Sequence, residues 1–383
     1  LSLSEVIGCA RVGESVTLGA PLPRGWCSDV SRLTLQNDQE DLLPLQARVL
    51  DRWSDGSLRW VLLTFSASVS PSSAATVWLG VADLRRPAAP LLGLIPTENG
   101  VAVDTGEGRF VVGTDGGLTA ETAGGIPFRG TIALTDAKGA TIPLEGLSVE
   151  PGNHGPLTAE VLVNGRFGGA LQLAFTARLE FVRGSAAVRM QATLRNTSRA
   201  EHPGGFWDLG DPGSRVIKDW SFTVHLPQSG SPWRARMSAE TGQPLQHVDL
   251  PLEIYQESSG GEHWQSRNHV NRDGVVPMGF RGYRVRSGGN ESHALRATPV
   301  LTLLDGRSQV SVAHRRFWQR FPKAFEATPE CLSVRLLPGQ FPDVHELQGG
   351  EQLTEEFVVC FGPDTVDRKS TRLNSSHVAL SRM

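Results

Sequence analysis

The sequence LQLAFTARLEF, residues 171–181, alternates apolar and polar side chains along its whole length. In an extended chain Leu171, Phe175 and Phe181 point to one side, and the polar residues between them point to the other. This period of two predicts a long β-strand that buries one face and exposes the other, as strands of antiparallel sheets do.

Shorter segments of the same character occur throughout the chain, and 42 glycines and 24 prolines separate them. Such runs between turn residues are typical of strands joined by tight turns. The segments are 12–18, 61–65, 76–79, 157–163 and 188–194. Only residues 311–327 suggest a helix, because phenylalanines recur there at four-residue spacing, and Pro322 would keep it short. The sequence therefore predicts an all-β fold.

A proline-rich segment, residues 85–96, shows little alternation and is predicted to be a linker. Residues 1–84 before it hold enough expected strands for a small β-barrel. Residues 97–366 after it hold many more, and a large antiparallel β-sandwich accommodates them best. We therefore expect an N-terminal barrel followed by a sandwich.

The composition excludes several classes of function. The chain carries a net charge of -3 with 39% hydrophobic residues, lacks the basic excess of a nucleic-acid-binding protein, and has no apolar run long enough for a membrane span. Four cysteines lie far apart without a CxxC pair, which argues against a zinc or redox motif and leaves the compartment undefined. Arginine dominates the 37 basic residues, which suits either carboxylate recognition or a GC-rich bacterial genome.

The two ends of the sequence bear on what can be inferred. The last segment, residues 367–383, reads DRKSTRLNSSHVALSRM, and its first eleven residues equal the translation of a widely used DNA sequencing adapter. We expect this tail to be non-native and the natural chain to continue differently. The sequence also begins with Leu1, so secretion or export to the periplasm stays open.

Short motifs carry a family resemblance. PLPRG at 21–25 is followed by QARV at 46–49 and RWSDGSLRWVLLTF at 52–65, in which Asp55-Gly56 predicts a hairpin turn. In this order they resemble the N-terminal RIFT-barrel domain of exo-rhamnogalacturonan lyase-like proteins. The likeness continues through VDTG at 103–106, GPLTAE at 155–160, RLEFVRG at 178–184, FWQRFPKA at 317–324 and HELQGGE at 345–351.

The resemblance implies a RIFT-type barrel, a central β-sandwich and then a helical α/α-barrel to which the lyase chemistry is mainly attributed. That last domain would begin where the tail at 367–383 begins, so no catalytic residue of the family can be placed here. The implied function is the non-catalytic N-terminal β portion of a lyase that degrades rhamnogalacturonan or a related acidic, pectin-type polysaccharide by β-elimination. The implied partners are that polysaccharide and the missing α/α-barrel.

The segment at 255–274, YQESSGGEHWQSRNHVNRDG, holds the richest group of polar and aromatic residues. An aromatic ring can stack on a sugar face, arginine can hold a uronate carboxylate, and asparagine can bond hydroxyls. The predicted substrate-binding residues are Tyr255, Trp264, Arg267, Asn268, His269 and Asn271. For acid–base catalysis the candidates are His269 and Glu262.

A second loop, residues 201–214, is rich in glycine and proline around Asp208 and Asp211. These carboxylates could join a site for a divalent cation such as calcium, which prefers oxygen ligands. Their spacing differs from that of an EF-hand. The competing interpretation is a turn-rich loop in which aspartate caps its own backbone.

Two alternative functions use the same residues. The chain could be a carbohydrate-binding or scaffold module without chemistry, with Trp264, Arg267 and His269 gripping the glycan. It could also be a sugar epimerase built on a broad sandwich. That enzyme would need His269, His314 and His345, with Glu262 or Glu346, to converge in one open groove.

Overall fold

The computed structural model describes residues 1–6, 8, 10–83, 89–122, 127–203, 209–228 and 230–362. Strands dominate these residues, and the only helical elements among them are two single-turn 3-10 helices, η1 (Val30–Arg32) and η2 (Arg267–His269). The all-β prediction is confirmed. No helix in this part of the chain is long and apolar enough to cross a membrane.

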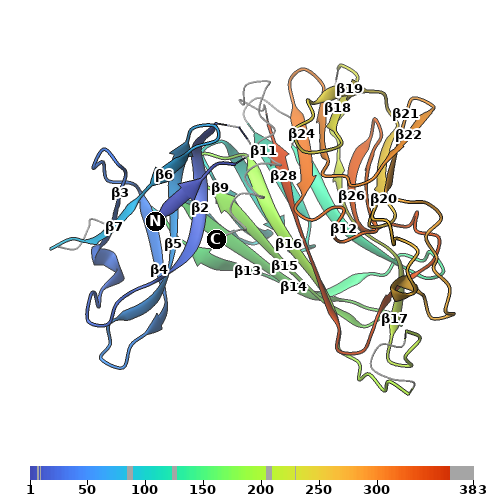
Figure 1. Ribbon diagram of the computed structural model, residues 1–383, viewed down its shortest axis with the longest axis horizontal. Coiled ribbons are helices and arrows are strands. Elements are labelled where there is room, and N and C mark those ends of the chain that lie inside the picture. The colour runs from blue at the N-terminus through green and yellow to red at the C-terminus, as the bar shows by residue number, and fades with distance from the viewer. Residues whose placement is uncertain are drawn as a thin grey trace.

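The N-terminal unit consists of short antiparallel sheets, drawn in blue at the left of Figure 1. Its pairings are β1 (Ser2–Ser4) with β6 (Ala74–Thr76), β3 (Leu33–Gln36) with β7 (Trp78–Val81), and β2 (Arg11–Pro21) with β5 (Leu58–Val69) and β4 (Leu45–Arg52). The predicted turn at Asp55-Gly56 joins β4 to β5, and Gly56 adopts the positive φ of 84° that the turn requires. A separate hydrophobic cluster, including Leu33, Leu63 and Phe65, fills this unit.

The sandwich contains two large antiparallel sheets. The nine-stranded sheet follows the order β13 (Leu144–His154), β14 (Thr158–Phe167), β15 (Leu173–Val182), β16 (Ala187–Asn196), β28 (Gln352–Phe361), β24 (Gln309–His314), β23 (Val300–Leu304), β18 (Arg234–Ser238) and β19 (Gln246–Val248). The C-terminal strand β28 therefore lies in the middle of the sheet, between strands from distant parts of the sequence.

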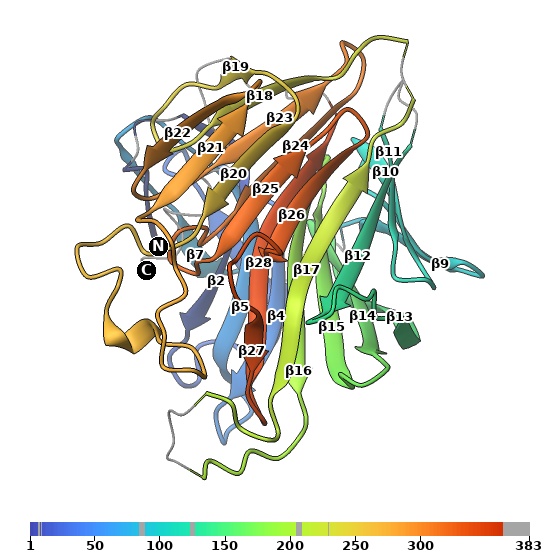
Figure 2. The same cartoon turned by 90° about the vertical axis from the view of Figure 1, so that its right-hand side faces the viewer.

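The twelve-stranded sheet faces the viewer in Figure 2. Its order is β22 (Asn290–Ala294), β21 (Tyr283–Ser287), β20 (Leu252–Gln256), β25 (Lys323–Ala327), β26 (Cys331–Leu337), β17 (Arg215–His225), β12 (Phe128–Asp136), β11 (Leu118–Thr122), β10 (Gly108–Gly113), β9 (Gly100–Asp104) and β8 (Gly93–Thr97), with β27 (His345–Leu347) also paired to β17.

Alternating strands build the core between these sheets. Strand β15 covers most of the segment at 171–181, and its apolar residues, such as Phe175 and Phe181, are buried. Phe181 lies 5.3 Å from Phe110 between ring centroids, and Phe110 lies 6.1 Å from Phe361 of β28. The predicted strand thus supplies one wall of the core, while its polar residues face outward.

The predicted short helix within 311–327 is wrong. Residues up to His314 form β24, residues 323–327 form β25, and a turn joins the two. Phe317 and Phe325 pack edge to face at 5.0 Å within the core. Their spacing reflects a chain that turns back between the two sheets, a geometry that the sequence pattern does not distinguish from a helical turn.

The predicted domain limits stay predictions. Strand β8 begins at Gly93, inside the expected linker 85–96, and Leu92 belongs to the sandwich core. Residues 84–88 and the tail at 367–383 lie outside the described residues.

One side chain fastens the N-terminal unit to the sandwich. Gln46 of β4 accepts hydrogen bonds from the backbone amides of Leu157 (3.0 Å) and Thr158 (2.9 Å), and its Nε2 donates to Thr158 Oγ1 at 3.0 Å. A Cβ added at Gly155 would lie 2.2 Å from Gln46 Cδ. Two of the motifs that carry the family resemblance, QARV and GPLTAE, therefore meet in space, and we call this contact the Gln46 clasp.

Candidate functional site

The predicted polar segment leaves the sandwich as a long loop between β20 and β21, drawn in amber at the lower left of Figure 2. We refer to residues 257–277 as the polar loop. Its single helical turn, η2, is capped by Ser266, whose hydroxyl accepts from the Asn268 amide. Glu262, Arg267 and Asn268 are exposed. The loop therefore presents charged and amide groups to solvent, as a binding segment would.

Tyr255 is separated from the other predicted residues. It lies on β20, fully buried, with Phe280 against its ring edge at 5.9 Å and the Arg284 guanidinium over its face at 5.1 Å. Burial raises the pKa of the Tyr255 phenol. Because the ring is covered, Tyr255 supports Arg284 and is not placed to stack on a sugar.

His269 and Asn271 line a cavity of about 280 Å³ together with Arg272. Across from them lies the segment 341–347. Asn271 Nδ2 donates to Asp343 Oδ2 at 2.7 Å, and the Arg272 guanidinium lies 3.0 Å from Glu346 Oε2. Two charge-assisted contacts thus hold the polar loop against the opposite wall, and the cavity lies between them.

His345 also lines this cavity and stacks on Phe341 with ring centroids 5.1 Å apart. His345 Nε2 donates to the Pro338 carbonyl at 3.0 Å. Burial lowers the pKa of His345 to about 4. The ring is therefore neutral at physiological pH and offers an apolar, aromatic face.

Further along the polar loop, His269 contacts Phe321 edge to face at 5.6 Å. Phe321 belongs to the turn between β24 and β25, residues 315–322, which we call the arginine loop because it carries Arg315, Arg316 and Arg320. Trp318 of this loop stacks on the Arg296 guanidinium at 4.5 Å. Arg315 pairs with Glu356 and Arg320 with Glu355, whereas Arg316 is exposed, and the sequence analysis did not single out this loop.

The candidate acid–base pair does not meet. Glu262 and His269 both belong to the described part of the chain, and no hydrogen bond or ion pair joins their side chains there. Their assignment as catalytic residues stays a prediction that this geometry does not favour, because acid–base partners act within hydrogen-bond reach of a shared substrate atom.

A buried ionic cluster, missed by the sequence analysis, lies beneath the arginine loop. Glu355 of β28 accepts from His314 Nε2 at 3.0 Å and from Arg320 Nε at 3.1 Å, and Lys323 Nζ lies 3.4 Å away. The Arg316 amide donates to His314 Nδ1, which leaves the proton of the neutral ring on Nε2, facing Glu355. We call these four side chains the Glu355 cluster.

Burial sets the protonation states of this cluster. It lowers the pKa of His314 and of Lys323. Burial alone would raise the pKa of Glu355, but Lys323, His314 and Arg320 together hold it at about 2. Glu355 is therefore a permanent anion that Arg320 and Lys323 neutralise, and its place in the core indicates a structural role.

The three histidines of the epimerase hypothesis do not converge. His269 and His345 line the same cavity as Glu346, whereas His314 is buried in the Glu355 cluster. Glu346 is already bound by Arg272, Ser214 and the Gly210 amide. The arrangement therefore does not favour a sandwich-fold epimerase.

The calcium hypothesis rests on one residue that can be described. Asp208 lies outside the described residues, while Asp211 is buried and accepts from the amides of Glu201, His202 and Gly213. These bonds, led by the His202 amide, lower the pKa of Asp211. Among the described residues no three His, Cys, Asp or Glu side chains form a group that could hold a metal. Asp211 therefore caps its own turn, as the competing interpretation states.

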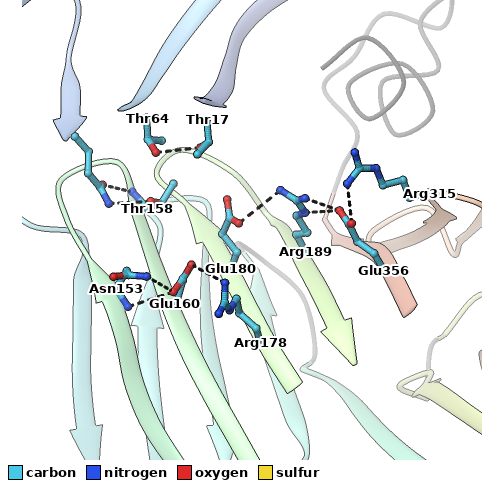
Figure 3. Close-up of polar contacts among 11 residues, drawn as sticks. Thr17, Thr64, Asn153, Thr158, Glu160, Arg178, Glu180, Arg189, Arg315 and Glu356 are labelled. Carbon is cyan, nitrogen blue, oxygen red and sulfur yellow. Dashed lines mark hydrogen bonds and ion pairs between the residues drawn. The ribbon is translucent and has the colours of Figure 1, made fainter. Parts of the chain in front are cut away.

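A second polar surface covers the outer face of the nine-stranded sheet, next to the N-terminal unit (Figure 3). Glu180 lies directly opposite Glu160 on one neighbouring strand and opposite Arg189 on the other. Arg189 Nε donates to Glu356 Oε1 at 2.6 Å, and the Arg189 guanidinium lies 3.7 Å from Glu180. Burial raises the pKa of Glu180, an effect that Arg189 opposes. We call this surface the charged row.

The comparisons with known proteins agree with the barrel and with the general architecture. Residues 8–79 match the family described as the PcRGLX-like N-terminal RIFT barrel domain, which is less than half of the chain. No curated protein matched the sequence.

Solved structures give the fold alone, since sequence identity is only 10%. An alpha-mannosidase from Enterococcus faecalis V583 superposes with a TM-score of 0.55 over 99% of this chain and 45% of its own. A protein of glycosyl hydrolase family 38 from Enterococcus faecalis gives 0.52 over 99% and 46%. The chain thus spans about half the length of these structures. Its N-terminal unit is a RIFT-type β-barrel, as predicted, and a large β-sandwich follows it.

Proposed function

We propose that this chain is the N-terminal, non-catalytic β portion of a lyase-like protein that acts on rhamnogalacturonan or a related acidic polysaccharide. The observation that carries the proposal is the match of residues 8–79 to the PcRGLX-like RIFT barrel family. The polar loop supports it, because it carries aromatic, amide and cationic groups and its residues His269, Asn271 and Arg272 line a cavity. The role of this portion is to bind the polysaccharide.

Within the polar loop, each residue has a distinct part in the proposed contact. Trp264 stacks on the face of a sugar ring, and the exposed guanidinium of Arg267 pairs with a uronate carboxylate. His269, in contact with Phe321, lines the cavity together with Asn271. Arg316 of the arginine loop, which is exposed, adds positive charge that attracts an anionic chain.

The proposed reaction of the whole protein is β-elimination. A base removes the proton α to the uronate carboxylate, and the 4-O-linked sugar leaves as the double bond forms. Cationic groups stabilise the enediolate that develops in between. In this proposal the base belongs to a part of the protein beyond the described residues, so the chain alone binds without cleaving.

Binding is tested by calorimetry with oligogalacturonides, using the chain and its Trp264→Ala and Arg267→Ala variants. Both variants should weaken binding about tenfold, because each loses a stacking or charge-assisted contact. Arg109→Ala is the matched control, since Arg109 is exposed on β10, toward the opposite edge of the twelve-stranded sheet from β20 and β21. Unchanged affinity in both loop variants would remove the polar loop from the proposed site.

Cleavage is tested separately, by following the unsaturated product by ultraviolet absorbance. The chain by itself should form none from rhamnogalacturonan, and an uninterrupted copy of the gene should form it. Turnover by the chain alone would contradict the non-catalytic assignment, and binding without turnover by the uninterrupted protein would favour a carbohydrate-binding module.

A further inference from the structure

At the Gln46 clasp the barrel sheet and the nine-stranded sheet are in contact, and away from it they diverge. On the barrel side, Thr17 and Thr64 are hydrogen-bonded to each other at 3.0 Å on the outer face of β2 and β5. Figure 3 shows both threonines across from Glu180 of the charged row. In Figure 1 the blue barrel strands and the green strands β14 to β16 diverge from the clasp, with an open angle between the two sheets. The outer faces of the two sheets therefore face one another near the clasp.

The barrel surface presents an aromatic side chain beyond the clasp. Trp60 lies four residues from Thr64 on β5, so both point to the same face, about 13 Å apart. A Cβ added at Gly19 would lie 3.7 Å from the Trp60 ring, which places the ring over the glycine of the neighbouring strand. Trp60 is 40% exposed, and the strand register sets Asp51 of β4 opposite it. The indole of Trp60 offers a flat apolar face.

On the sandwich surface, an arginine lies as many residues from the clasp as Trp60 does on the barrel surface. Thr158 of the clasp pairs with Val182, and Arg178 lies four residues from Val182 on the same face of β15. The Arg178 side chain is 52% exposed and reaches Glu160 only at 3.9 Å. Further along, Arg166 and Arg195 flank Ala174 on the neighbouring strands, and both are exposed. Arginines thus continue away from the clasp beyond the carboxylates Glu160 and Glu180 of the charged row.

We propose that these two surfaces together bind one strand of an acidic polysaccharide, with Trp60 stacked on a sugar ring and Arg178 paired with a uronate carboxylate. Arg166 and Arg195 extend the contact to following residues of the glycan. An indole face and a row of half-exposed guanidinium groups suit an alternation of apolar sugar faces and carboxylates. The inference rests on the proposed function for its class of ligand, but it uses a surface far from the polar loop in sequence.

Calorimetry with the whole chain and an oligogalacturonide tests the proposal at low salt. Trp60→Ala and Arg178→Ala should each weaken binding about tenfold. Trp78→Ala is the matched control for the indole, because Trp78 is 62% exposed on the separate β3–β7 sheet. Arg109→Ala is the matched control for charge, and neither control should change affinity. A neutral galactan oligosaccharide should bind more weakly than the oligogalacturonide and should respond to Trp60→Ala alone.

The outcomes separate this inference from the proposed function. Weaker binding in Trp264→Ala and Arg267→Ala, with Trp60→Ala and Arg178→Ala unchanged, would overturn the inference and leave the proposed function standing. The reverse pattern would support the inference and remove the polar loop. Absence of binding by the unaltered chain would overturn both. If an uninterrupted protein binds equally well with and without the Trp60 and Arg178 substitutions, another part of that protein covers the surface and the inference is wrong.

Discussion

Gln46 and Gly155 fit closely against each other where the barrel meets the sandwich. The glutamine side chain satisfies two backbone amides and one hydroxyl at once, and the missing side chain of Gly155 makes room for it. Gly155 is needed because a side chain would not fit there, and not for its backbone conformation, since its φ is not positive. The contact therefore depends on both residues together.

The first prediction concerns this pair. Gly155→Ala should destabilise the chain by about 1–3 kcal/mol, because the new Cβ overlaps the Gln46 side chain. Gln46→Ala should cost a similar amount through lost hydrogen bonds. The double variant should lose less than the sum, since removal of Gln46 also removes the clash. Urea unfolding of the four proteins, followed at the transition of the barrel, measures the coupling, and strict additivity would show that the two residues act independently.

The second prediction concerns His345 and pH. Its pKa in the folded protein is about 4, below the ordinary 6.5, so the unfolded chain binds the proton more readily. The neutral ring makes its full contribution to the free energy of unfolding above pH 6.5. This contribution declines as the pH falls and is lost below pH 4. The change is about 3 kcal/mol. His345→Gln retains a donor for Pro338 without titrating, so its unfolding free energy should depend less on pH in this window.

The third prediction concerns Glu355. Glu355→Gln should destabilise the chain by about 3–5 kcal/mol, because Lys323 and Arg320 lose the charge that compensates their burial. Thermal unfolding measures the loss. Glu291→Gln is the control, since Glu291 is an exposed partner of Arg286 and its loss should change little. An equal effect of both substitutions would contradict a special role for the buried cluster.

At the scale of single elements, the polar loop depends on two side-chain contacts with the segment 341–347. Asn271→Ala removes the contact with Asp343. Hydrogen exchange in residues 262–276 should then become faster while the global unfolding midpoint changes little, because the loop adds few apolar contacts to the core. Asn268→Ala is the control on the same loop, as Asn268 is exposed. Unchanged exchange in Asn271→Ala would mean that other contacts hold the loop.

Strands were predictable where the alternation was long and the turn residues were specific. Strand β15 and the hairpin at Asp55-Gly56 follow directly from period and turn chemistry. The arginine loop was not predictable. The phenylalanines in and after it have a helix-like spacing, but the chain there reverses direction and packs Phe317 and Phe325 into the core. Local pattern does not report such tertiary packing.

The candidate site was predictable only in part for the same reason. The polar composition of the loop around Trp264 and His269 was evident, and His269 with Asn271 does line the cavity. Tyr255 belongs to the same stretch of sequence, yet the strand β20 turns it under Arg284. The arginine loop and the wall at 341–347 come from distant segments, which no local motif brings together.

At the scale of the whole molecule, the barrel and the sandwich have separate hydrophobic cores. Gln46→Ala should therefore separate their unfolding, so that calorimetry resolves an earlier transition of the barrel from a later one of the sandwich. Tryptophan fluorescence should follow the earlier transition through Trp53 and Trp60, which lie in or beside the barrel strands. Gln36→Ala is the control for a barrel glutamine away from the clasp. A single shared transition in Gln46→Ala would mean that other contacts couple the two cores.

The clasp also has a consequence for how such proteins can be recombined. On the sandwich side, Gln46 forms hydrogen bonds with the main-chain amides of Leu157 and Thr158 and with the Thr158 hydroxyl. Side chains on this part of the sandwich can therefore change without loss of the contact, provided that a glycine stays at position 155. A barrel taken from a distant homologue could be grafted onto this sandwich if it carries a glutamine at the matching place. The barrel and the sandwich would then be exchangeable domains, joined in each hybrid by the same glutamine contact.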